Sequence, residues 1–135
     1  MAVANGLLAK TMYPSPSEIV LGILGFMPST TIPAPLIYFQ NALFKIKSEG
    51  KYEELLKNVT FDNSLPCPSS EDIDRLLFFL LSSNVLRSSD YKSNTYYVTS
   101  DNKNVLVDNA KRVFCKKQLE QLSELSIDIN SQLIK

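Results

Sequence analysis

The chain has 135 residues, in which 14 lysines and arginines balance 14 aspartates and glutamates, and it contains no histidine and no tryptophan. At this length one domain with its own core is expected, and 44% apolar with 21% charged residues exclude a disordered or fibrous protein. Without histidine, a Ser-His-Asp triad, a Cys-His pair and a histidine-containing zinc site are impossible, so we expect no enzyme, no metal and no cofactor.

The longest apolar run, residues 19–27, predicts a buried helix. It is too short to span a bilayer and it ends at Pro28. Glu18 stands beside it and no clean small-x-small cleavage site follows, which disfavours a secretory signal. Cys67 and Cys115 lie far apart without a C-x-x-C motif, as is typical of idle thiols in a reducing compartment. The sequence therefore predicts a cytoplasmic protein with no membrane partner.

The first firm start signal is the run Ser15-Pro16-Ser17-Glu18. Ser15 and Glu18 have the spacing of a capping box and Pro16 suits the first helical position, so a helix is predicted over 16–26. Residues 1–14 precede this signal and are predicted to form a flexible N-terminal arm. Pro28 and the run 29–31 are expected to break the chain.

A second helix is predicted over 34–49, with Gly50 as a left-handed cap. Residues 51–58 predict a short turn whose apolar side chains face inward: Tyr52, Leu55 and Leu56. The clearest element is a helix over 69–83, where Ser69 and Asp72 have capping-box spacing and three carboxylates lie in the first turn. Its apolar residues include Phe78 and Phe79 and reach almost all round, which predicts a helix central to the core.

Beyond Asn84, a residue that tolerates a left-handed helix exit, the pattern changes to that of strands. Residues 85–87 and 95–99 predict a hairpin with a polar tip at 88–94. Residues 103–135 are helical in pattern with one break.

This order of elements resembles a winged helix-turn-helix domain, most strongly over 71–109. The run 76–87, followed by Tyr96-Tyr97-Val98-Thr99 and a new helix, is similar to the family pattern L-x-x-L-x-x-x-G-L-I … Y-x-L-T-x-x-G, with Asn84 where Gly is usual. Over 33–98, the aromatic-bearing run Leu36-Ile37-Tyr38-Phe39, then Phe61 and then Pro68-Ser69 at the start of the apolar helix are similar to the Panacea-type winged helices of small antitoxins and adaptors. The resemblance implies an α+β fold with a β-hairpin wing and an added C-terminal helix, with 15–117 as the winged-helix domain.

Winged helices that bind DNA need cations on the third helix and the wing. Here the third helix opens with Glu71, Asp72 and Asp74, which is the wrong sign for phosphates. A basic run follows the hairpin, in which Arg112 and Lys116 share a helix face. The predicted contacts to double-stranded DNA are Arg75, Arg87, Lys92, Lys111, Arg112, Lys116 and Lys117.

The C-terminal segment 118–135 carries an apolar stripe made of Leu119, Leu122, Leu125, Ile129 and Leu133. Such a stripe either folds back as a final core helix or pairs with another chain; PadR-type winged-helix regulators dimerise in this way, and dimerisation or partner binding is the expectation here. The sequence thus predicts a small non-catalytic winged-helix regulator of transcription that binds DNA weakly or as a homodimer. The alternative is a protein-interaction adaptor or antitoxin-like module that binds a partner protein and no DNA.

Overall fold

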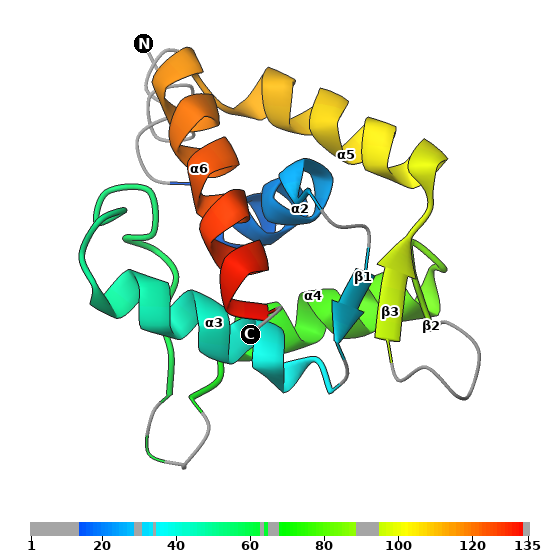
Figure 1. Ribbon diagram of the computed structural model, residues 1–135, viewed down its shortest axis with the longest axis horizontal. Coiled ribbons are helices and arrows are strands. Elements are labelled where there is room, and N and C mark those ends of the chain that lie inside the picture. Colours follow the sequence, from blue (N-terminus) through cyan, green and yellow to red (C-terminus); the bar gives the residue numbers. More distant parts are fainter. Residues whose placement is uncertain are drawn as a thin grey trace, which may run out of the picture.

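The computed structural model describes residues 14–28, 31–33, 35–62, 64, 68–88 and 95–133, so the predicted N-terminal arm lies outside the described residues apart from Pro14. Within these ranges the chain forms five helices and one small antiparallel sheet, which confirms the α+β class. The elements in chain order (Figure 1) are α2 (Pro16–Phe26), β1 (Thr31–Pro33), α3 (Ile37–Ser48), α4 (Glu71–Ser82), β2 (Leu86–Ser88), β3 (Thr95–Val98), α5 (Ser100–Val113) and α6 (Lys116–Leu133).

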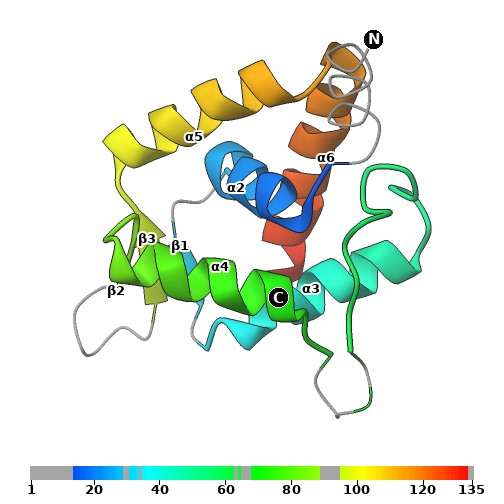
Figure 2. The same cartoon turned by 180° about the vertical axis from the view of Figure 1, so that it is seen from behind.

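Helix α2 lies at the centre of the molecule and packs against α4, α5 and α6 (Figures 1 and 2). Its predicted capping box is confirmed: the Glu18 N–H donates to the Ser15 hydroxyl at 3.2 Å, and the Ser15 N–H donates to Glu18 Oε1 at 2.9 Å. A methyl group on Gly22 would lie 2.4 Å from Leu122 Cδ2, so glycine permits the close approach of α6. Three α2 side chains have no exposed surface at all: Ile19, Val20 and Ile23.

The sheet has the order β1-β3-β2, with both strand pairs antiparallel. The predicted hairpin is confirmed as β2 and β3, in which Leu86 lies opposite Val98. Strand β1 is a feature that the sequence did not predict, because residues 29–31 were expected only to break the chain. Ile32 lies opposite Tyr96 of β3. A strand of three residues is too short to show alternation, and its partner is distant in the sequence.

The helix predicted over 34–49 and the turn after it are confirmed, but α3 begins at Ile37, three residues later than predicted. The helix ends before Gly50, which has a φ of 82° in the left-handed region. The following segment turns its apolar side chains into the core, where Tyr52, Leu55 and Leu56 are buried.

The N-cap of α4 lies one residue later than predicted, and the helix begins at Glu71. Ser70, rather than Ser69, is the N-cap, and its hydroxyl accepts from the Ile73 N–H at 3.4 Å. Ser69 is held in an isolated β-bridge, because its N–H and C=O both bond to the backbone of Asp62. The helix ends as predicted, with Asn84 at a φ of 64°.

The C-terminal region forms α5 and α6 with one break between them, as predicted, although α5 begins at Ser100, three residues before the predicted start at 103. Figure 1 shows α6 running back across α2 and ending beside α3, and it packs on both helices. Leu122, Leu125 and Ile129 have no exposed surface, while Leu119 and Leu133 are partly buried against the same core. The predicted dimer or partner interface through this stripe is therefore corrected: the helix folds back, and its apolar face is already covered by its own chain.

Candidate functional site: the outward face of α4

Helix α4 has one face in the core and one in solvent. Its buried side chains are Ile73, Leu77 and Leu80. Phe78 and Phe79 point outward, with 72% and 62% of their surfaces exposed. The prediction that this helix is central to the core is therefore wrong, because α2 and β2 cover α4 along only one side. The exposed outward stripe is called the α4 face here and consists of Glu71, Asp72, Asp74, Arg75, Phe78 and Phe79.

The first turn of α4 makes this face acidic. Glu71 and Arg75 form an ion pair one helical turn apart, with both side chains about three-quarters exposed, so the one cation of the face is neutralised locally. Asp72 and Asp74 have no cation partner among the described residues. Their carboxylates interact favourably with the positive end of the helix dipole. The face thus combines two exposed aromatic rings with a surplus of negative charge.

Gln40 of α3 fixes the position of this first turn. Its side chain is 1% exposed, its Oε1 accepts from the Ser70 N–H at 2.7 Å, and its Nε2 donates to Asp74 Oδ1. One amide therefore satisfies the buried N–H of the helix cap and holds a carboxylate of the α4 face. Sequence reasoning missed this role; the only signal was a polar residue at a position in the apolar stripe of its helix.

The cations predicted to bind DNA are not brought onto one surface. Arg75 belongs to the α4 face, and Arg87 is exposed on β2, where its Nε donates to the Asn84 carbonyl at 3.1 Å. Lys92 lies outside the described residues. The other four cluster at the junction of α5 and α6, here called the α5–α6 corner: Lys111, Arg112, Lys116 and Lys117.

All four side chains of the α5–α6 corner are exposed, and none pairs with an acidic group in the part of the chain that the structure describes. The corner is separated from α4 by α2, because α5 runs along one side of α2 and α4 along the other (Figures 1 and 2). A DNA duplex on the α4 face would therefore not be held by these four cations as well.

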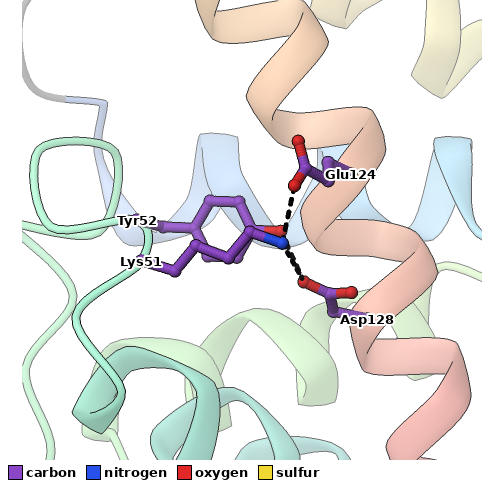
Figure 3. A network of polar contacts seen from close by, with 4 residues as sticks. All are labelled: Lys51, Tyr52, Glu124 and Asp128. Carbon is purple, nitrogen blue, oxygen red and sulfur yellow. Dashed lines mark hydrogen bonds and ion pairs between the residues drawn. The ribbon is translucent and has the colours of Figure 1, made fainter.

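A third polar cluster, shown in Figure 3, ties the segment after α3 to α6. Lys51 Nζ lies 2.6 Å from Glu124 Oε1 and 3.4 Å from Asp128 Oδ2, and the Tyr52 hydroxyl donates to the same Asp128 oxygen. The bond to Glu124 raises the pKa of Lys51, and burial together with the bond to Asp128 raises the pKa of Tyr52. The cluster joins two segments distant in sequence, which is a structural role, and no sequence pattern indicated it.

Other classes of site have little support among the described residues. No group of three or more histidine, cysteine, aspartate or glutamate side chains there is arranged to hold a metal ion. No helix within the described ranges is long and apolar enough to cross a membrane. Cys115 is a free, exposed thiol, while Cys67 lies outside the described residues.

Comparison with protein-family models, with curated proteins and with solved structures gives no match to this chain.

Proposed function

We propose that this chain is a winged-helix-type protein-interaction module that binds a partner protein through the α4 face. The order of elements supports the winged-helix assignment. Along the described chain a helix, a strand, two helices and a hairpin follow one another, and the three strands form a sheet in the order β1-β3-β2. In such domains the third helix is the one presented to ligands, and α4 is the third helix of the described residues.

The observation that carries the proposal is the exposure of Phe78 and Phe79, at 72% and 62%. Large aromatic side chains are enriched in the buried centres of protein interfaces and are under-represented on bare surfaces. Neighbouring phenylalanines on a regular helix offer a rigid apolar surface whose burial is favourable. Neither ring stabilises the core of this chain, so both are available to a second protein.

The charge of the α4 face favours a protein partner over DNA. Asp72 and Asp74 repel phosphate, and Arg75 is already paired with Glu71. The complementary ligand is a polypeptide segment with an apolar side chain for the rings and a lysine or arginine for the carboxylates. We expect the rings to supply most of the affinity and the carboxylates to set the orientation.

The test compares the full chain with the double variant Phe78→Ser/Phe79→Ser and with the control Val105→Ser, which removes a 64% exposed apolar side chain from α5. Partners captured from an extract of the native cells by the immobilised wild type are identified, purified and titrated calorimetrically. The proposal expects binding to weaken by about tenfold or more in the double variant and to be unchanged in the control. Equal affinity of the double variant and the wild type would refute it.

The wild type and the double variant also test whether the partner is a second copy of this chain. Light scattering of the wild type and the double variant measures their masses. A dimer mass that falls to a monomer mass only in the double variant would identify a second copy of this chain as the partner. A monomer mass for both leaves the partner as a different protein.

A transcriptional regulator that binds double-stranded DNA is the second candidate. The α5–α6 corner favours it, because its four cations are exposed and form no ion pair with the described residues. Four phosphate contacts predict a slope of about −3 to −4 for the logarithm of the affinity against the logarithm of salt concentration. Fluorescence anisotropy with random duplex DNA measures this slope. Absence of binding below about 100 μM protein at low salt would remove the candidate. The variant Lys116→Gln/Lys117→Gln should reduce the slope by about two, whereas Phe78→Ser/Phe79→Ser should leave it unchanged.

A further inference from the structure

A pocket of about 390 Å³ opens where α3, the end of α6 and β1 meet. Figure 1 shows the end of α6 close to α3 and β1. Four lining residues lie on one face of α3 at helical spacing: Tyr38, Asn41, Ala42 and Lys45. The walls are completed by Pro33 of β1 and by Gln132 and Leu133 of α6. The volume lies within the range of known small-molecule sites, and the pocket shares no residue with the α4 face or the α5–α6 corner.

Asn41 and Lys45 are the two polar lining residues on which the chemistry of this pocket depends. The Asn41 Oδ1 is buried and accepts no hydrogen bond from the described residues. A buried polar atom without a partner is rare and destabilising, so a group that supplied a donor would be bound favourably. Asn41 lines the pocket and its amide makes no side-chain hydrogen bond to the described residues, so a rotation of this amide would bring Oδ1 to the pocket wall without breaking such a bond. Lys45 is exposed, stands one turn further along the helix, and forms no ion pair within the described ranges.

The rest of the pocket is suited to an apolar body. Tyr38 is 52% exposed although its ring is large, and Pro33 and Leu133 present carbon atoms to the same space. An aromatic ring inserted here would cover the Tyr38 ring. Binding would be favourable because the apolar surfaces of both rings are removed from water. The unpaired cation, the unpaired carbonyl oxygen and the apolar wall together define the chemistry of the ligand.

We propose that this pocket binds a small aromatic carboxylate that also carries an O–H or N–H donor. The carboxylate pairs with the Lys45 ammonium, the donor bonds to Asn41 Oδ1, and the ring packs between Pro33, Tyr38 and Leu133. This site is independent of the proposed function, because none of its residues belongs to the α4 face.

The probe is 3-(4-hydroxyphenyl)propanoate, titrated into the isotopically labelled full chain and followed by amide chemical shifts. A ligand with about a dozen non-hydrogen atoms predicts a Kd on the order of 1 mM. We expect saturable shifts confined to the amides of 38–45 and 132–133. Two related compounds separate the contacts: the corresponding propanamide lacks the charge, and 3-phenylpropanoate lacks the donor. Each should bind about three- to fivefold more weakly than the probe.

Protein variants complete the test. Lys45→Met should remove the preference for the carboxylate over the amide, and Asn41→Leu should remove the preference for the hydroxylated compound. Lys111→Met, which neutralises an exposed cation away from the pocket, should change neither preference. The proposal is overturned if no saturable shift occurs in these two segments by about 10 mM probe, roughly ten times the expected Kd. It is also overturned if Lys45→Met, at an exposed position that tolerates substitution, binds the carboxylate as the wild type does.

Discussion

Replacing Gln40 by Met tests whether one buried amide holds α4 on α3. Methionine has a similar volume, so the change removes two hydrogen bonds and leaves little space unfilled. Ser70 is 2% exposed, and losing its acceptor leaves a buried N–H unpaired, at a cost of about 1 to 3 kcal/mol. Asp74 is exposed and regains water when its donor is lost, so its contribution is small. The expected loss of unfolding free energy is about 2 kcal/mol.

Urea unfolding followed by far-ultraviolet circular dichroism measures this loss. With an m-value of about 2 kcal/mol per molar urea, the midpoint should fall by about 1 M while the m-value stays constant. Gln121→Met is the matched control, because that partly buried glutamine of α6 makes no side-chain hydrogen bond with the described residues; we expect a change within about 0.5 kcal/mol. If Gln40→Met loses no more than the control, the two hydrogen bonds do not hold the helices together and the reasoning is refuted.

Three further substitutions test other contacts. Gly22→Ala places a methyl group against Leu122, and should cost about 1 to 3 kcal/mol in the same urea assay; an unchanged midpoint would show that α6 does not pack closely on α2. Ser15→Ala removes the capping hydroxyl and should lower Tm by about 4 °C in a calorimetric scan, and an unaltered Tm would contradict the capping box. Burial raises the pKa of Tyr52, so above about pH 10 the unfolded chain releases a proton that the folded chain retains, and stability falls as pH rises. Tyr52→Phe should reduce that fall and, by losing the bond to Asp128, cost about 1 kcal/mol at neutral pH; a pH profile identical to that of the wild type would count against this.

Local chemistry explains the predictions that are confirmed. The box of Ser15 and Glu18 satisfies N–H groups at the start of the helix within four residues of sequence. Gly50 and Asn84 end their helices in the left-handed region because these residue types tolerate a positive φ. Each of these signals is complete within a few residues, which is why the sequence alone was sufficient.

The features that were missed depend on contacts between distant parts of the chain. Strand β1 exists because it pairs with β3, and Gln40 acts through residues on another helix. The apolar pattern of α4 was compatible with burial of Phe78 and Phe79. They are exposed to solvent because α2 and β2 pack on the other side of the helix. For α6 the pattern fitted both folding back and pairing between chains. An apolar stripe indicates that the helix face will be buried, but it does not show whether the same chain or a second chain buries it.

The two outer strands of the sheet limit how this protein can associate with others. β1 contains Pro33, which has no N–H to donate, and β2 is three residues long and carries the exposed cation Arg87. Proline, short length and charge are devices by which edge strands resist pairing with further chains. The sheet is thus a poor template for strand addition and for amyloid-like growth. Because its edges are short and protected, the exposed apolar surface of the described residues lies on helices, where Phe78 and Phe79 of α4 are the largest adjacent pair.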